Sequence, residues 1–213
     1  MIRLQIALCL MLLILTGCGS DGVAPPSPET RSDGRQRYLA LGDSYTIGEA
    51  VVPRLRFPVQ LANLLATRGK PVDDPVIIAR TGWTTSELIA AVEADPPEGE
   101  FALVTLLIGV NDQYRGRDAE EYREDFREML QKAISFASGS PARVVVVSIP
   151  DWGLMPYAEG RDRGAIAAEI DRFNQVAREE AERAGARWVD ITTFSRSVSH
   201  HEPMIASDGL HPS

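Results

Sequence analysis

Five short apolar runs, separated by segments with helical periodicity, constrain the fold of this chain more than any other feature. Each run is apolar at successive positions instead of alternating with polar residues, so a strand formed by it would be buried on both faces. Strands of this kind that alternate with helices predict a parallel sheet with helices packed on each side, a three-layer α/β fold. The runs cover residues 38–41, 76–79, 101–108, 144–149 and 188–191.

The segments between these runs carry helix signals. Pro58 suits a first helical turn, and Gly69 ends the apolar periodicity of the same segment. The hydroxyl groups of residues 81–86 can cap the helix that follows them. We therefore expect helices over residues 58–66, 87–92, 118–136 and 164–184.

We expect the flavodoxin-like strand order 2-1-3-4-5 for this five-stranded sheet. In that order the first and third strands are neighbours, and the segments that follow them leave toward opposite faces, which opens a crevice at the carboxyl ends of the strands. Ser44 follows the first strand, Gly82 the second and Asn111 the third. Three polar turns would then converge on one edge of the sheet.

Length and charge bound the class of protein. A chain of 213 residues suits one domain with a well-buried core. Its formal charge is −8 at pH 7, its acidic residues are spread along the chain, and no stripe of basic residues could neutralise phosphates. These features argue against nucleic acid as a partner. The sequence carries no signal of oligomeric state.

The first residues are typical of a secretion signal. Arg3 precedes a mostly apolar stretch from Leu4 to Leu15 that is short for a membrane span. Its end, Leu15-Thr-Gly-Cys18, resembles the lipobox of bacterial lipoproteins. The resemblance implies that a signal peptide of residues 1–17 is removed and that Cys18 receives a lipid. An ordinary signal peptide with an incidental Cys18 is the alternative.

A lipidated Cys18 implies a membrane-anchored protein of the cell envelope, on the periplasmic face of a membrane or at the cell surface. Gly19 stands where an inner-membrane retention signal would have Asp, so we expect the outer membrane in an organism that has two membranes. Residues 18–36 have too few apolar groups for a core and form a flexible tether to a domain of residues 37–213. Cys9 would leave with the signal, so the mature domain has no internal disulfide.

A hydroxyl group stands at the end of the first predicted strand. Gly42 gives the backbone freedom to turn sharply, and Ser44 follows at the edge of the sheet where α/β proteins bind ligands. Serine is a poor nucleophile until a base takes its proton, so a catalytic Ser44 requires a histidine within reach. The alternative is structural, with Asp43 or Ser44 capping the next segment.

Three histidines are candidates for that base. His200 and His201 stand in a polar stretch without an acid at a helpful spacing, and we expect both on the surface. Asp208 precedes His211 by three residues, so its carboxylate can turn back and hold one ring nitrogen while the other faces Ser44. An exposed histidine in an Asp-Gly turn is the alternative.

These residues belong to a larger pattern. Four separated blocks match, in order, the blocks of the SGNH (GDSL) hydrolases, and they span most of the predicted domain. The sequence therefore resembles this family, and it lacks the Gly-x-Ser-x-Gly elbow of the α/β-hydrolases. The blocks are Gly42-Asp-Ser44, Gly82, Gly109-Val-Asn-Asp112 and Asp208-Gly-Leu-His211.

The resemblance implies a role for each matching residue. Ser44 would be the nucleophile, His211 the general base and Asp208 the acid that orients it. The Ser44 amide, the Gly82 amide and the Asn111 side chain would form an oxyanion hole, where fixed donors stabilise charge on the carbonyl oxygen. The implied reaction is hydrolysis of a carboxylic ester through an acyl-enzyme on Ser44, without a cofactor or a metal.

The end of the sequence departs from the family. Its members usually continue past the His-Pro pair into a terminal helix, whereas this sequence ends at Ser213. His211 would lie near a free end, where fraying is expected unless the segment is held. Two interpretations stay open: a truncated domain, or an end held by loop residues.

The substrate is less constrained than the reaction. Families of this shape include lysophospholipases, short-chain esterases, thioesterases and deacetylases of cell-envelope sugars. We expect an esterase or lysophospholipase-like acylhydrolase acting on a small ester or lipid, with an O-acetylesterase of cell-envelope or environmental carbohydrate as the alternative. Residues that could wall an acyl or sugar pocket are Trp83, Tyr114, Trp152, Met155 and Tyr157.

Two other classes of function compete with the hydrolase. A zinc site from His200, His201, Asp208 and His211 is one, although their spacing matches no helical pair of metal ligands. The other is a tethered lipoprotein that binds a ligand in the same crevice without catalysis. That interpretation gives no reason for a nucleophile, a base, an acid and oxyanion donors to occur together.

Overall fold

A parallel sheet with helices on both faces organises the chain. The computed structural model describes residues 36–198 and 204–213. The sheet has five strands in the order β2-β1-β3-β4-β5, and every neighbouring pair is parallel. The predicted fold class and strand order are therefore confirmed. The strands are β1 (Tyr38–Gly42), β2 (Val76–Ala79), β3 (Leu103–Leu107), β4 (Val144–Val147) and β5 (Arg187–Val189).

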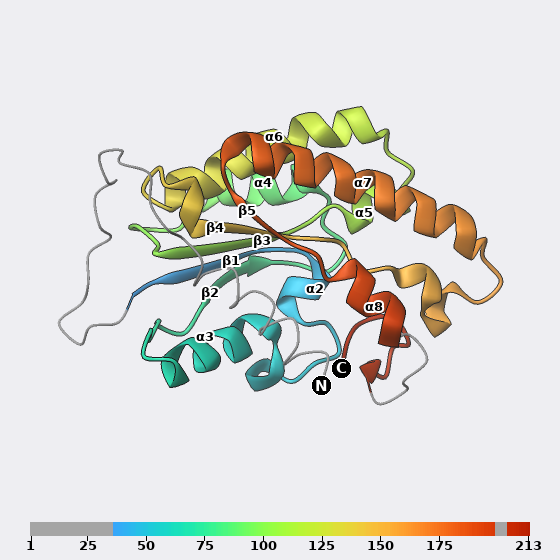
Figure 1. Cartoon of the computed structure of the whole chain (residues 1–213), viewed down its shortest axis with the longest axis horizontal. Helices are drawn as coiled ribbons and strands as arrows, with labels where there is room; N and C mark the ends of the chain where they lie inside the picture. The colour runs from blue at the N-terminus through green and yellow to red at the C-terminus, as the bar shows by residue number, and fades with distance from the viewer. Residues whose placement is uncertain (1–35, 199–203) are drawn as a thin grey trace.

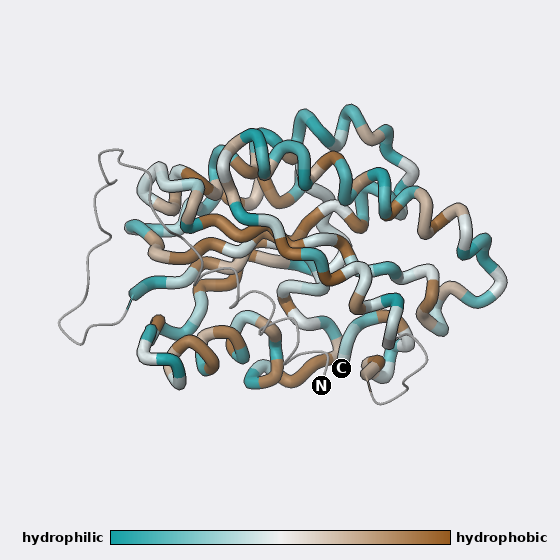
Figure 2. Tube along the Cα trace, viewed as in Figure 1, coloured by the Kyte–Doolittle hydropathy of each residue, from teal (hydrophilic) through white to brown (hydrophobic). Residues whose placement is uncertain are grey.

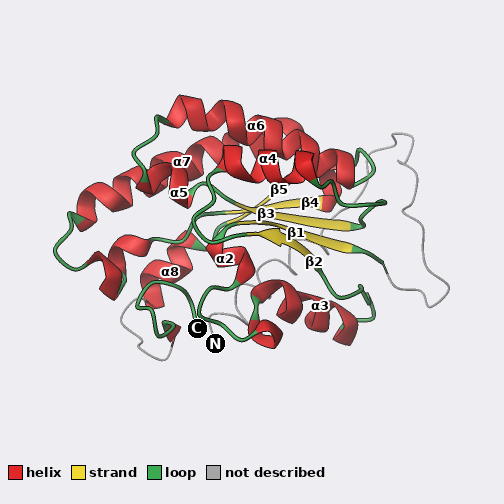
Figure 3. Ribbon diagram, turned by 180° about the vertical axis from the view of Figure 1, so that it is seen from behind, coloured by secondary structure: helices red, strands yellow, loops and turns green. Residues whose placement is uncertain are grey.

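Helices form a layer on each side of the sheet. Figure 1 shows α4 (Thr85–Ala94), α6 (Ala119–Phe136) and α7 (Arg163–Ala184) over one face and α3 (Phe57–Thr67) over the other. The view from behind shows the same layers (Figure 3). The short elements are α2 (Ser44–Ile47), α5 (Val110–Tyr114), α8 (Thr192–Val198), η1 (Pro53–Leu55), η2 (Pro141–Arg143), η3 (Trp152–Leu154) and η4 (Pro156–Ala158).

The core lies between the sheet and the helices on its two faces, and the strands form its most hydrophobic part (Figure 2). Every residue of β1, β3 and β4 is buried, as the apolar runs predict. The outer strands differ, because each has a partner on one side only. Val76 at the start of β2 is 38% exposed, and Arg187 and Trp188 of β5 are partly exposed.

Three of the main helices, α4, α6 and α7, begin at polar caps. Thr84 and Glu87 form a capping box at the start of α4, with each side chain bonded to the other residue's amide. Asp118 accepts a hydrogen bond from the Glu120 amide at the start of α6, and Asp162 does the same from Ala165 for α7. Because these caps satisfy amides that have no acceptor within the helix, they set where the helices start.

The helices α2, α5 and α8 have no counterpart in the sequence prediction. Each is too short to show a helical period of apolar residues, so periodicity does not find it. Figure 1 shows α2 and α8 close together near the carboxyl end of β1. Ser44 is thus the first residue of a short helix and not part of an open turn.

Gly42 has a role that differs from the predicted one. It is the last residue of β1 and does not adopt the positive φ that favours glycine. A Cβ at this position would collide with the Leu107 carbonyl oxygen and the Thr46 hydroxyl. Glycine is therefore required for close packing of β1 on β3 and α2, not for a sharp turn.

Several sequence predictions lie outside the described residues. They concern the signal peptide of residues 1–17, Cys18 and nearly all of the tether, and the surface positions of His200 and His201. Within residues 36–198 and 204–213, no helix has the length and apolar character needed to cross a membrane.

Candidate active site

The topology places Ser44 and Asn111 at the same edge of the sheet. β1 and β3 are hydrogen-bonded neighbours with Gly42 opposite Leu107, and Ser44 and Asn111 follow these strands by a few residues. Asp43 is the N-cap of α2, and its carboxylate accepts a hydrogen bond from the Tyr45 amide at 3.0 Å. The capping interpretation of this motif is thus confirmed for Asp43. Ser44, the next residue, lines a cavity.

Asp43 is fully buried beside the candidate nucleophile. Burial raises the pKa of Asp43 to about 8, the Tyr45 amide opposes this, and the nearby Asp112 carboxylate adds to it. Its Oδ2 atom has no hydrogen-bond partner among the described residues. Asp112 is better paired, since it accepts hydrogen bonds from Thr85 and pairs with Arg117 at 2.8 Å. Asp43 is therefore the acid held neutral near pH 7.

Asp208 and His211 form a hydrogen-bonded pair. His211 Nδ1 lies 2.7 Å from Asp208 Oδ2, while Asp208 Oδ1 accepts hydrogen bonds from the Leu210 and His211 amides. Partial burial raises the pKa of Asp208, but these hydrogen bonds outweigh it, so the net pKa lies below the usual range. The carboxylate thus remains charged and fixes the orientation of the imidazole. The ring of Tyr45 packs edge-on against the His211 imidazole, with 5.2 Å between the ring centres.

The segment that carries His211 is held by its neighbours. The Ala206 amide donates to the His211 carbonyl at 2.7 Å, and the Ser213 amide donates to the Met204 carbonyl at 2.9 Å. Ile205 and Pro212 form an antiparallel bridge between the same two stretches. His211 is consequently buried, with 5% of its surface exposed.

Two cavities meet at Ser44, Tyr45 and His211. We call the first the aromatic pocket and the second the apolar pocket. The aromatic pocket is completed by Val110, Asn111, Tyr114, Trp152, Tyr157 and Leu210. The apolar pocket is completed by Gly48, Val51, Leu55, Arg56, Phe57, Leu107, Pro150, Ile191 and Pro212.

The candidate oxyanion donors lie around this junction. As the first residue of α2, Ser44 has an amide with no acceptor inside the helix. Asn111 Nδ2 donates one hydrogen to the Trp83 carbonyl at 2.9 Å, which fixes the amide group and leaves its second hydrogen available. Gly82 precedes Trp83 but does not itself line either pocket.

Gly82 is held in a conformation that favours glycine. Its φ is +86°, and no atom lies within 4 Å of the position that a Cβ would occupy. Arg115 donates to the Gly82 carbonyl at 2.6 Å and pairs with Glu87 at 3.2 Å. The hydrogen bond from Arg115 fixes the peptide group between Gly82 and Trp83. The next carbonyl along the chain, that of Trp83, is the one that Asn111 contacts. Sequence reasoning missed Arg115, which lies three residues beyond the Gly109–Asp112 block.

Three of the five predicted wall residues line the aromatic pocket. Trp152 is buried and donates its indole N–H to the Gln113 side-chain oxygen at 2.8 Å. Tyr114 and Tyr157 are half-exposed, and their hydroxyl groups are hydrogen-bonded to each other at 3.1 Å. The Arg161 guanidinium lies 5.1 to 5.5 Å from all three ring centres. Met155 lines a separate apolar cavity, and Trp83 lines neither pocket.

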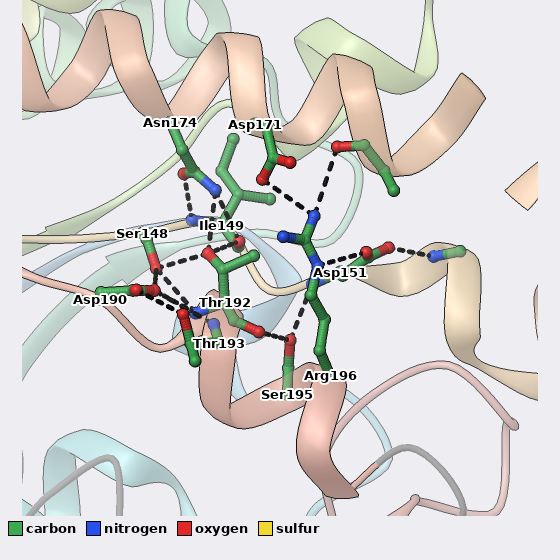
Figure 4. Close-up of polar contacts among 12 residues, drawn as sticks. Ser148, Ile149, Asp151, Asp171, Asn174, Asp190, Thr192, Thr193, Ser195 and Arg196 are labelled. Carbon is green, nitrogen blue, oxygen red and sulfur yellow. Dashed lines mark hydrogen bonds and ion pairs between the residues drawn. The ribbon is translucent and has the colours of Figure 1, made fainter. Parts of the chain in front are cut away.

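A polar network supports the loop that carries Trp152. Figure 4 shows Arg196 of α8 reaching toward Asp151 of this loop and Asp171 of α7, at 2.8 and 2.9 Å. Asn174 of α7 hydrogen-bonds both the amide and the carbonyl of Ile149, just before the loop begins. The loop is therefore tied to both helices, which positions one wall of the aromatic pocket.

The predicted zinc ligands are only partly described. Asp208 and His211 bond to each other, and His200 and His201 lie outside the described residues. Within the described part of the chain, no group of three or more His, Cys, Asp or Glu side chains could hold a metal ion.

Comparisons with known proteins place this geometry in context. No curated protein matches the sequence significantly. Solved structures share the fold: TesA is 24% identical with a TM-score of 0.65, covering 84% of this chain and 89% of that one. AlinE4, an esterase of the SGNH-hydrolase family, is 19% identical with a TM-score of 0.65, covering 84% and 87%. A mutant of Axe2, an acetyl-xylooligosaccharide esterase from Geobacillus, is 21% identical with a TM-score of 0.63 and the same coverage.

A family match covers the whole of the candidate site. Residues 40–213 match the model of the GDSL-like lipase/acylhydrolase family. The matched range includes all four sequence blocks and every strand of the sheet except the start of β1. This chain therefore belongs to the GDSL-like lipase/acylhydrolase family and is a carboxylic-ester hydrolase of the SGNH type.

Proposed function

We propose that the protein hydrolyses carboxylic esters through an acyl-enzyme on Ser44, with His211 as the base and Asp208 as its orienting acid. One observation carries this proposal: the buried His211 is bonded to Asp208 through Nδ1 and shares both cavities with Ser44. With Nδ1 held by the carboxylate, Nε2 is the ring nitrogen left for the serine proton.

The proposed reaction uses Ser44, His211 and Asn111 at the pockets, with Gly82 next to the Trp83 carbonyl that Asn111 contacts. His211 removes the Ser44 proton as the hydroxyl oxygen attacks the ester carbonyl, and it returns the proton to the departing alcohol. The Ser44 and Gly82 amides and the Asn111 side chain donate to the oxyanion of the tetrahedral intermediate. Water, activated by the same histidine, releases the acid and restores the serine.

A sugar O-acetylesterase is the second candidate. Tyr114 and Tyr157 are 43% and 44% exposed at the mouth of the aromatic pocket, and such rings offer flat apolar faces to a sugar ring. The Axe2 mutant, which shares this fold, comes from an enzyme named for acetylated xylooligosaccharides. The mostly apolar lining of the second pocket at Ser44 suits the acyl chain of a lysophospholipase-like acylhydrolase.

We also propose that the enzyme works from a membrane surface, anchored by a lipid on Cys18. The lipobox-like Leu15-Thr-Gly-Cys18 and the polar tether after it support this location. For an organism with two membranes, Gly19 after the cysteine favours the outer membrane.

Hydrolysis of 4-nitrophenyl butyrate by the purified parent and three variants tests the proposed function. We expect Ser44→Ala and His211→Ala to remove nearly all turnover. Asp208→Asn should keep more activity than His211→Ala, because the base remains and only its orientation and charge stabilisation are lost. Turnover by Ser44→Ala at the parent rate would contradict the proposal. A panel of acetyl, butyryl and octanoyl esters, together with an acetylated xylooligosaccharide, then separates the two substrate classes.

A further inference from the structure

Within the described part of the chain, Arg56 is the one Lys or Arg among the residues that line the apolar pocket, whose lining is otherwise mostly apolar. It lines the apolar pocket together with Ser44 and His211. No Asp or Glu occurs among the described residues that line this pocket. Glu49, which directly follows the lining residue Gly48, is hydrogen-bonded to the Thr81 hydroxyl.

The Nε atom of Arg56 differs from the charged groups of several other arginines of this chain, because it is buried without a hydrogen-bond partner among the described residues. By contrast, the partly exposed Arg117 pairs with three carboxylates and Arg196 with two. The stem of Arg56 packs tightly on Gly48, where a Cβ would lie 2.7 Å from Arg56 Cγ. This packing holds the side chain at the pocket wall.

A buried donor on a charged group without a partner is energetically unfavourable, and an acceptor from a ligand relieves that cost. Guanidinium matches the two oxygens of a carboxylate or phosphate with two parallel hydrogen bonds. The apolar surroundings exclude water and strengthen such a pair. An anionic group on the substrate is therefore the acceptor that best fits this wall of the pocket.

We propose that Arg56 determines specificity for esters that carry an anionic group, a carboxylate or a phosphate, on the half of the molecule that enters the apolar pocket. This inference rests on the proposed function, because it uses Ser44 as the point from which the substrate extends. The net charge of −8 makes a dedicated cation more necessary, since the rest of the chain repels anionic substrates.

Matched pairs of substrates test the proposal in each half of the ester. 4-Nitrophenyl hydrogen adipate and suberate, compared with their methyl esters, carry the anion on the acyl half at two lengths. 4-Acetoxybenzoate and 4-acetoxyphenyl phosphate, compared with methyl 4-acetoxybenzoate, carry it on the alcohol half as a carboxylate or a phosphate. The measured quantity is the ratio of kcat/KM for the anionic substrate to that for its neutral partner.

Arg56→Gln should lower this ratio by roughly 10- to 100-fold for at least one anionic substrate, since a hydrogen-bonded charge is lost. Arg56→Lys keeps the charge without the two-pronged geometry and should fall between the parent and Arg56→Gln. Arg54→Gln is the matched control, because Arg54 is exposed on η1, the short helix that ends just before Arg56, and lines neither pocket. It should leave the ratio unchanged. Circular dichroism checks that each variant is folded.

The inference is wrong if Arg56→Gln and Arg54→Gln give the same ratio as the parent for every pair. If the parent hydrolyses neutral esters and Arg56→Gln does not change the ratio, the inference about Arg56 fails while the proposed function stands. Calorimetric binding to Ser44→Ala tests the same contact without turnover. The anionic member of the pair with the largest parent ratio should bind it more tightly than its neutral partner, and Ser44→Ala/Arg56→Gln should lose this difference; the same difference in both proteins would overturn the role of Arg56.

Discussion

At the scale of single residues, Asp43 shows how position changes chemistry. Its carboxyl caps α2 through the Tyr45 amide, yet one oxygen is buried without a partner among the described residues. Burial raises its pKa to about 8, so the folded protein holds a proton that the unfolded chain releases near pH 4. Between these pH values Asp43 is protonated in the folded state and ionised in the unfolded state. The contribution of Asp43 to the free energy of unfolding therefore falls as the pH rises.

Asp43→Asn tests this account, because asparagine mimics the neutral acid at every pH. The difference in unfolding free energy, parent minus variant, should fall by about 1 kcal/mol per pH unit from about pH 5 to near 8 and then level off. Urea unfolding of both proteins across this range measures it. A difference independent of pH would show that Asp43 is ionised in the folded protein.

Asn111 carries a prediction about catalysis. Its amide donates to the Trp83 carbonyl and has a second hydrogen for the oxyanion. The negative charge on the substrate's carbonyl oxygen develops in the transition state. Asn111→Ala should therefore lower kcat roughly 100- to 1,000-fold with little change in KM. Steady-state kinetics with a 4-nitrophenyl ester measures the effect. Unchanged kcat beside a lowered Tm would reduce Asn111 to a support for Trp83.

At the scale of elements, the loop after β4 depends on helices from elsewhere in the chain. Asp151 is buried, with 1% of its side chain exposed, and Arg196 of α8 is its cationic partner (Figure 4). Arg196→Leu would leave that carboxylate without its charge partner, and we expect a loss of about 2 kcal/mol, less than for a fully buried pair because Arg196 is partly exposed.

A surface pair provides the control for Arg196. Arg178 and Glu182 form a salt bridge on α7 in which both side chains are more than half exposed. Arg178→Leu should therefore lose much less stability than Arg196→Leu. Urea unfolding compares the two variants. If Arg196→Leu loses no more stability than Arg178→Leu, the network does not hold the loop.

The sequence predicted the long elements and missed the short ones, for one physical reason. β1, β3, β4 and the helices α6 and α7 each bury a continuous apolar run or face, which leaves a pattern in the sequence. α2, α5 and α8 each follow the end of a strand. They are too short to show the helical period of apolar residues that the prediction relies on. The predicted role of Gly42 in a sharp turn was wrong. Glycine is needed there because Leu107 and Thr46, which belong to other elements, leave no space for a Cβ.

At the scale of the whole molecule, the fold gathers Ser44, Asn111 and His211 from widely separated stretches into one site. Sequence reasoning could name them because each stands in a recognisable block. Arg56, Arg115 and Gln113 stand in no such position, and their contacts depend on how the loops pack. That is why these supports emerge only from the structure, whereas three aromatic wall residues were predicted from their places after strand ends.

The proposed anchor is also a property of the whole molecule. Cys18→Ser removes the sulfur that the lipid would occupy, so we expect a membrane-bound protein to become unprocessed or mislocalised. Fractionation of cells that express the parent or the variant, followed by mass spectrometry of the amino-terminal peptide, measures this. A variant that is processed and fractionates like the parent would contradict the lipid anchor.

The most direct test of the central claim is covalent labelling by a fluorophosphonate, followed by mass mapping of the modified peptide. Because an activated serine attacks phosphorus as it attacks an ester carbonyl, the parent should carry one adduct, on Ser44. His211→Ala should label far more slowly, and Ser44→Ala should remain unlabelled. An adduct on another residue, or labelling of Ser44→Ala at the parent rate, would contradict the assignment of Ser44 as the nucleophile.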